Sequence, residues 1–234
     1  MLQTVFAGLC RDIVEFTRRG VTEEAAPAVI LSRVERWRRL LEGELRGLSE
    51  AELRGLIGEL IILEADVMSA CSPYDAVCAW TGPLGAPQDF NLPSGQRIEV
   101  KALRPGAGEC RINGLGQLDS ESDPLILAVV RLDSVGREAE GAMNAASLIE
   151  RVRRTLAHAP PAQNEFDSRL AAAGWYEHPS HDEIMVRVVR IERYIVDSDF
   201  PKLTASTAPH GVIDADYTII LPSQGDPSSG ASRT

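Results

Sequence analysis

The 234-residue sequence lacks closely spaced cysteines, long apolar runs and an excess of basic residues. Its four cysteines form no Cys-x-x-Cys pair, which argues against a disulfide framework and against a structural zinc site. Reduced thiols are typical of the cytoplasm, where we expect this protein. The cysteines are Cys10, Cys71, Cys78 and Cys110.

No stretch approaches the roughly 18 apolar residues that a membrane-spanning helix needs. The opening residues MLQTVFAGLCRD have no basic region and no clear cleavage site. We therefore expect neither a signal peptide nor contact with a membrane. The sequence also has no Walker A loop, so any ATP-driven step has to come from a partner protein.

The basic residues are too few for strong, independent binding to nucleic acid. The chain has 34 acidic against 24 basic residues and a net charge of −10, whereas phosphate neutralisation needs clustered Lys and Arg. This charge balance is compatible with an enzyme that contacts DNA locally, through metal ions and a basic rim. It is also compatible with a chain whose DNA affinity comes from a partner subunit.

The hydrophobic content of 44% is enough for a packed core. Apolar residues at helical spacing predict an N-terminal helical region over 1–48, with helices over 1–20 and 23–45. A capping box, Ser49 with Glu52, opens a helix that runs to about residue 70. Residues 72–86, rich in Pro and Gly, are expected to be a loop anchored by Trp80.

The second half of the chain alternates between apolar strands and helices. Residues 124–132 form a near-continuous apolar run, which is typical of a central strand buried on both faces. The other expected elements are a short strand at 110–113, a helix starting in 114–119, helices at 144–156 and 163–173, a strand at 184–196, and a C-terminal extension over 200–203 and 211–219 with a last short strand. The Ser/Gly/Pro-rich residues 223–234 are expected to be a disordered tail.

The segment Ala86–Leu103 carries the most informative pattern in the sequence. Two strand-like runs flank a Pro-Ser-Gly turn, and a hairpin centred on Ser94 places Asp89 directly opposite Glu99. Strand side chains alternate between faces, so Glu99 and Lys101 point the same way. Opposed like charges destabilise a sheet unless a cation lies between them or one carboxyl is protonated.

Two converging carboxylates suit Mg²⁺ or Mn²⁺, which prefer oxygen ligands. A lysine on the same face can orient or deprotonate a water, or stabilise a developing phosphate charge. Lys101 lies within an apolar run, and burying a charge in such a run costs free energy unless the charge is paired. The alternative is an exposed hairpin whose charged face is merely solvated.

These residues resemble the core motif of the PD-(D/E)XK nuclease superfamily. Glu99-Val100-Lys101 matches the (D/E)XK element, and Pro87-Gln88-Asp89 matches the PD element with one residue inserted. The resemblance implies an α/β, restriction-endonuclease-like αβββαβ core over 49–222, with an added N-terminal helical layer. Further blocks, such as Gly-Leu-Ile-Gly-Glu-Leu and Phe-Pro-Lys-Leu, resemble a PD-(D/E)XK-motif family of bacterial phage-defence cassettes.

The resemblance implies roles for further residues. Glu59 resembles a glutamate that reaches the metal site from the helix before the hairpin; alternatively it is a surface residue. Gln117 is a candidate catalytic residue from the region after the acid-x-Lys strand. The candidate nucleic-acid contacts are Arg104, Arg111 and Asn113, and ordinary turn structure is the alternative for this region.

The sequence therefore predicts a Mg²⁺- or Mn²⁺-dependent DNA endonuclease, with Asp89, Glu99 and Glu59 at the metal and Lys101 at the attacking water. It would belong to a prokaryotic restriction or defence system, with an ATPase, helicase or methyltransferase as partner. A homodimer would suit double-strand cutting. One alternative is a catalytically silent interaction subunit that keeps the nuclease fold, and another is a nuclease acting on RNA or single strands.

Overall fold

The computed structural model describes residues 47–120 and 124–222, together with Cys10, Val14, Ile30 and Val34. Apart from those four residues, the helices predicted over 1–20 and 23–45 lie outside the described residues. The tail predicted over 223–234 also lies outside them.

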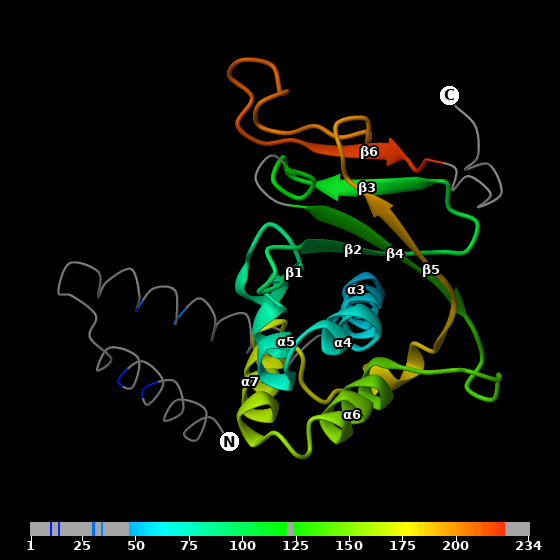
Figure 1. Cartoon of the computed structure of the whole chain (residues 1–234). Helices are drawn as coiled ribbons and strands as arrows, with labels where there is room; N and C mark the ends of the chain where they lie inside the picture. The colour runs from blue at the N-terminus through cyan, green and yellow to red at the C-terminus, as the bar shows by residue number, and fades with distance from the viewer. Residues whose placement is uncertain are drawn as a thin grey trace, which may run out of the picture.

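The described part of the chain forms three layers, with helices on one side, a mixed sheet in the middle and a two-stranded sheet on the other side (Figure 1). The main sheet has the strand order β1-β2-β4-β5, in which β2 and β4 are parallel and the other neighbours are antiparallel. Its strands are β1 (Phe90–Asn91), β2 (Arg97–Leu103), β4 (Leu125–Ser134) and β5 (Val186–Ile195). The second sheet pairs β3 (Glu109–Asn113) with β6 (Asp216–Ile220).

The helical layer lies on one face of the main sheet. Helix α3 packs directly on β2, and α5 packs on α7. None of the described helices is both long and apolar enough to cross a membrane. The helical elements are α3 (Glu50–Ile62), η1 (Leu63–Val67), α4 (Met68–Ala70), α5 (Pro73–Ala79), η2 (Gly82–Leu84), α6 (Ala145–Thr155), α7 (Pro160–Ala172) and η3 (Pro179–Glu183).

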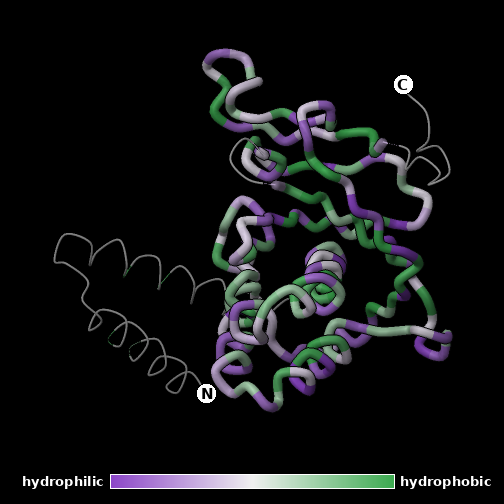
Figure 2. The backbone as a smooth tube through the Cα atoms, viewed as in Figure 1, coloured by the Kyte–Doolittle hydropathy of each residue, from purple (hydrophilic) through white to green (hydrophobic). Residues whose placement is uncertain are grey.

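Strand β4 separates two hydrophobic cores. Ala128 and Val130 face the helical layer, whereas Leu127 and Val129 face the β3–β6 sheet, and all four are fully buried. A strand buried on both faces needs a nearly continuous apolar sequence, as predicted for 124–132. Hydrophobic stretches of the chain (green in Figure 2) line the spaces between the layers.

The predicted αβββαβ order is confirmed. Helix α3, the β1–β2 hairpin, strand β4, helix α6 and strand β5 follow one another, and β4 is the third strand of the main sheet. Strand β3 was expected at 110–113, but it pairs with β6 outside the main sheet. The αβββαβ core therefore carries a β3–β6 layer on the face opposite the helices.

Three local predictions were wrong. Residues 73–79, expected to be loop, form α5, because Ser72 caps the helix by accepting from the Asp75 amide and Pro73 occupies the first turn. Residues 114–119 form turns and not a helix, and Gly114 has φ +87°. Helix α7 begins at Pro160, three residues before the predicted start, because proline is well suited to a first helical turn.

The helix predicted up to residue 70 is interrupted. The capping box at Ser49 is present, with the Glu52 amide donating to Ser49 Oγ at 3.3 Å and the Ser49 amide donating to Glu52 Oε2 at 2.8 Å. A five-residue π-helical segment, η1, then separates α3 from α4. Such π turns are rare and frequently lie at functional sites, and this one begins four residues after Glu59.

Candidate active site

The hairpin has the register that the sequence predicts. Phe90 pairs with Ile98 and Asn91 with Arg97, which centres the hairpin on Ser94. Continuing the register by one residue places Asp89 opposite Glu99. Asp89 lies just before β1, which begins at Phe90, and its Oδ2 accepts a hydrogen bond from the Val100 amide at 2.8 Å. A carboxylate thus takes the place of a main-chain acceptor at the edge of β2.

Glu99 and Lys101 lie side by side on the face of β2 that is turned toward the β3–β6 sheet. Lys101 Nζ lies 2.9 Å from Glu99 Oε1, and the two side chains are 13% and 2% exposed. Alternation along the strand brings the two residues to one face, as predicted. The lysine head group is therefore fixed beside the carboxylate, away from bulk solvent.

Gln117 holds the lysine from the loop after β3. Its Oε1 accepts from Lys101 Nζ at 2.7 Å and from the Asn113 amide at 2.8 Å. The side-chain amide thus ties the end of β3 to Lys101. In the described part of the chain the Gln117 side chain contacts Lys101 and the Asn113 amide, a position from which it can orient the lysine; its predicted catalytic role stays a prediction.

Glu59 lies on α3 near the hairpin, where the charges of Asp89 and Lys101 act on it. Its Oε2 accepts a hydrogen bond from Trp80 Nε1 at 2.6 Å. The preceding residue, Gly58, allows the close approach of α3 to β2, because a Cβ there would lie 3.3 Å from Ala102 Cβ and 3.4 Å from Val100 Cγ1. The polar-surface alternative for Glu59 does not fit this position beside the hairpin.

The Asp89 backbone is held by a segment whose role the sequence did not reveal. The carbonyl of Asp89 accepts from the amides of Thr81 at 2.8 Å and Gly82 at 3.0 Å. A Cβ on Gly82 would lie 2.7 Å from Asp89 Oδ1, so the segment needs glycine there. The neighbouring Gln88 is buried and donates to the Gly116 carbonyl at 2.7 Å, which joins the hairpin to the Gln117 loop.

The three acids have raised pKa values. Burial raises the pKa of Glu59 to about 8, with the charge of Asp89 adding to the shift. Burial also raises the pKa of Asp89 to about 6, against the Val100 hydrogen bond and the charge of Lys101. The pKa of Glu99 is raised well above its ordinary value by burial first and by Asp89 second. The single positive charge of Lys101 does not offset the effect of burial on the pKa values of Glu59, Asp89 and Glu99.

The donor set fits a divalent cation. Oxygen Oε2 of Glu99 is buried and has no hydrogen-bond partner among the residues that the structure describes. The charge of Asp89 acts on this carboxylate, and all the side-chain donors are oxygens, which Mg²⁺ and Mn²⁺ prefer. Within 47–120 and 124–222, however, no three His, Cys, Asp or Glu side chains are grouped closely enough to surround one ion. A cation here would thus have at most two direct carboxylates from the described residues, and main-chain or water oxygens would have to complete its shell.

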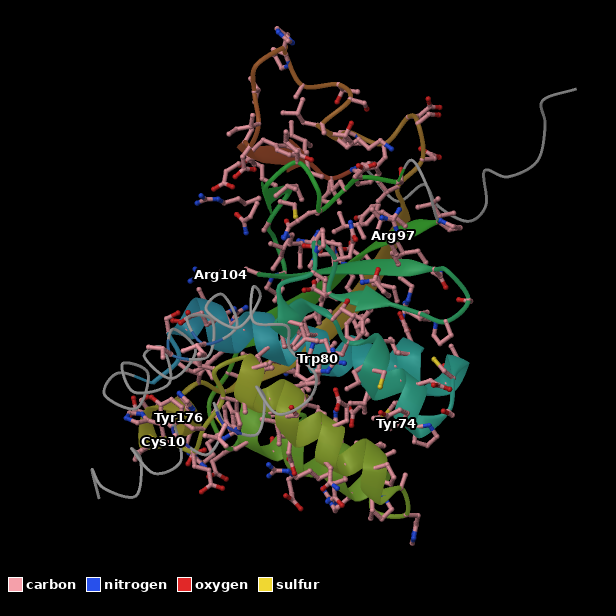
Figure 3. The ribbon with its side chains drawn as sticks, turned by 90° about the vertical axis from the view of Figure 1, so that its left-hand side faces the viewer. Cys10, Tyr74, Trp80, Arg97, Arg104 and Tyr176 are labelled. Carbon is pink, nitrogen blue, oxygen red and sulfur yellow. The ribbon has the colours of Figure 1, made fainter. Side chains whose placement is uncertain are left out.

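The structure does not bring the predicted nucleic-acid contacts to the carboxylates. Arg104 follows β2, about 10 Å along the strand from Lys101, and Figure 3 shows Arg97 and Arg104 at opposite ends of this strand. Arg111 is exposed on the outer face of β3 and pairs with Asp216 at 2.8 Å. The side chain of Asn113 is exposed as well, while its amide contacts Gln117.

The mixed sheet, the helix packed on its hairpin and the acid, acid and lysine set define a restriction-endonuclease-like α/β domain. Residues 1–222 match the model of a family described as "Putative PD-(D/E)XK family member" (DUF4420). The chain belongs to this family. A search of curated proteins and a search of solved structures each find no match to this chain.

Proposed function

We propose that this chain is a metal-dependent DNA endonuclease of a prokaryotic restriction or defence system, which hydrolyses phosphodiester bonds. The observation that carries the proposal is the buried Oε2 of Glu99, which has no hydrogen-bond partner in the described part of the chain. A buried acceptor without a partner costs about 1–3 kcal/mol, and more when it is charged. A divalent cation at this position would satisfy that oxygen and offset the clustered negative charge.

Asp89 and Glu99 would hold the cation directly. The amide and carbonyl of one strand residue point to the same side, so the Val100 carbonyl faces the same edge of β2 as the amide that contacts Asp89. This carbonyl would be a third oxygen ligand, and Glu59 would reach the ion through a water. A bound Mg²⁺ or Mn²⁺ supplies a lowered pKa for an attacking water and neutralises charge on the phosphate.

Lys101 would orient the water and the scissile phosphate. Its ammonium has three N–H donors, and Glu99 and Gln117 take two of them. The third would contact the attacking water or a phosphate oxygen. In an in-line displacement the water oxygen bonds to phosphorus while the bond to the leaving oxygen breaks, and the leaving oxygen takes up a proton.

The test is plasmid cleavage with Mg²⁺ or Mn²⁺, combined with calorimetric titration of Mn²⁺. We expect metal-dependent nicking by the wild type and at least about 10³-fold less by Asp89→Asn and Lys101→Ala. Asp89→Asn should also lose Mn²⁺ affinity, whereas Lys101→Ala should keep most of it. Asp216→Asn, an exposed acid paired with Arg111, is the matched control. Unchanged cleavage by both site variants would contradict the mechanism.

A second candidate function is a catalytically silent interaction subunit. It is favoured by the pairing of exposed arginines with acids, which leaves less positive charge for DNA: Arg151 with Glu64, Arg187 with Asp133 and Arg193 with Asp66. On this reading the purified chain binds no Mn²⁺ and co-purifies with an ATPase, helicase or methyltransferase. A nuclease that needs such a partner would bind Mn²⁺ alone and cleave DNA after the partner is added.

A further inference from the structure

The indole of Trp80 joins two parts of the candidate site. Its N–H donates to Glu59 Oε2 at 2.6 Å, and the two residues that follow Trp80 donate their amides to the Asp89 carbonyl. One short segment therefore contacts both the acid from α3 and the acid of the hairpin. A buried indole N–H needs an acceptor, and here that acceptor is a carboxylate.

Three contacts fix the position of Trp80. The residue is fully buried, and its ring packs against Phe166 with centroids 5.9 Å apart. Its carbonyl accepts from Arg169 Nη1 at 2.7 Å, and its backbone forms a bridge with Phe90. Figure 3 shows Trp80 inside the molecule, between the helices and the sheet. The N–H that meets Glu59 therefore comes from a rigid support.

We infer that Trp80 is a positioning residue for the metal site: its indole N–H holds one carboxylate oxygen of Glu59, so that the other is directed toward Asp89 and Glu99. This inference rests on the proposed function, because it assigns Trp80 a task in metal binding. A glutamate side chain has three rotatable bonds, and fixing it beforehand lowers the entropy lost when a cation binds. Partners that orient metal-binding groups typically change metal affinity by 10- to 100-fold.

The first experiment compares Mn²⁺ affinities by calorimetry in the full chain. Trp80→Phe keeps a packed ring and removes the N–H, and we expect about tenfold weaker binding. Trp175→Phe is the matched control, since Trp175 is also buried but packs on His181. A double-mutant cycle then separates positioning from packing. In the Glu59→Ala background, the further change Trp80→Phe should leave the affinity unchanged.

The second experiment reads the hydrogen bond directly in the folded, metal-free protein. The chain has three tryptophans, so the ¹H–¹⁵N spectrum has three candidate indole signals, and Trp80→Phe identifies one of them. Should Trp80→Phe fail to fold, Trp175→Phe and Trp37→Phe assign the other two. Glu59→Ala should move the Trp80 N–H signal upfield, and Mg²⁺ should move it in the wild type.

Four outcomes of these experiments would overturn the inference. An indole signal that ignores Glu59→Ala overturns it. Equal Mn²⁺ affinity of wild type and Trp80→Phe overturns it while leaving the proposed function standing. An equal loss in the presence and absence of Glu59 also overturns it, because Trp80 would then act through packing. A wild type that binds no Mn²⁺ overturns the proposed function, and this inference with it.

Discussion

Two clusters of buried charge share the face of the main sheet that is turned toward β3–β6: Arg131 and Glu192 lie there, and so do Glu99 and Lys101 of the candidate site, which Glu59 joins from α3. The two clusters differ in how their charges are balanced. In one, Arg131 of β4 pairs with Glu192 of β5 at 2.5 Å, and Arg190 binds the second oxygen of Glu192 at 3.0 Å. In the other, a single lysine meets the three carboxyl groups of the candidate active site.

The pKa values express this difference. Burial would raise the pKa of Glu192, but hydrogen bonds and charge from Arg131 and Arg190 bring it below its ordinary value. In the candidate site, burial and repulsion from Asp89 outweigh the lowering effects of Trp80 and Lys101, and the pKa of Glu59 rises to about 8. The first cluster is satisfied by the protein itself and serves the fold. The second is not balanced by the described residues themselves, and such perturbed groups cluster at functional sites.

The largest expected effect comes from removing a charge in the balanced cluster. Glu192→Gln leaves the buried guanidinium of Arg131 without its counter-charge, although Arg131 also donates to the Ala107 carbonyl. We expect the free energy of unfolding to fall by about 3 kcal/mol, measured by urea denaturation at neutral pH. A loss below about 0.5 kcal/mol would mean that the two clusters do not differ in the way described.

The matched change in the candidate site should have the opposite sign. Glu59→Gln keeps an acceptor for Trp80 and removes a charge whose pKa in the folded protein, about 8, lies above the ordinary 4.5. The folded protein favours the protonated form of Glu59. The stability that this form contributes is complete below pH 4.5 and is lost as the pH rises through 8. We expect the metal-free variant to be more stable than the wild type by about 2 kcal/mol near pH 9.

The pH series provides the control for that prediction. Near pH 4 both the folded and the unfolded wild type carry a neutral Glu59, so the difference between wild type and variant should vanish. Saturating Mg²⁺ should also stabilise the wild type near pH 9 and reduce the advantage of the variant. A constant difference between pH 4 and pH 9 would show that the Glu59 charge is not the cause.

The placement of Asp89 offers a smaller test. Gly82→Ala introduces a Cβ that would lie 2.7 Å from Asp89 Oδ1, so the carboxylate has to move. We expect about tenfold weaker Mn²⁺ binding by calorimetry, since this displacement alters a ligand without removing it. The control is Gly106→Ala, where the new Cβ meets no atom within 4 Å. Equal affinities for the two variants would contradict the assigned role of Gly82.

How far the sequence predicts this molecule depends on the range of the contacts involved. Alternation along β2 and the turn at Ser94 fix the relation of Asp89, Glu99 and Lys101, because these are local properties of a hairpin. The pairing of β3 with β6 joins segments about a hundred residues apart, and no local pattern encodes it.

The same distinction holds within the site. Trp80 was predicted to anchor a loop, and it is fully buried, but its bond to Glu59 links positions 21 residues apart. The hydrogen bonds from the Thr81 and Gly82 amides to the Asp89 carbonyl leave no signal beyond the Gly-Pro dipeptide, which the sequence alone assigns to a turn. Contacts made by main-chain groups depend on the fold and not on side-chain type, so a sequence does not display them.

The smallest expected effect compares two glycines of α3. A Cβ on Gly55 would meet no atom within 4 Å, so Gly55→Ala should raise the free energy of unfolding by about 1 kcal/mol through helix propensity alone. Gly58→Ala places its Cβ 3.3 Å from Ala102 Cβ and pushes α3 away from β2, which offsets that gain and shifts Glu59. Urea denaturation together with Mn²⁺ calorimetry checks both effects. If Gly58→Ala stabilises the protein as much as Gly55→Ala and binds Mn²⁺ equally well, then the close approach of the helix is not what places Glu59 in the unbalanced cluster.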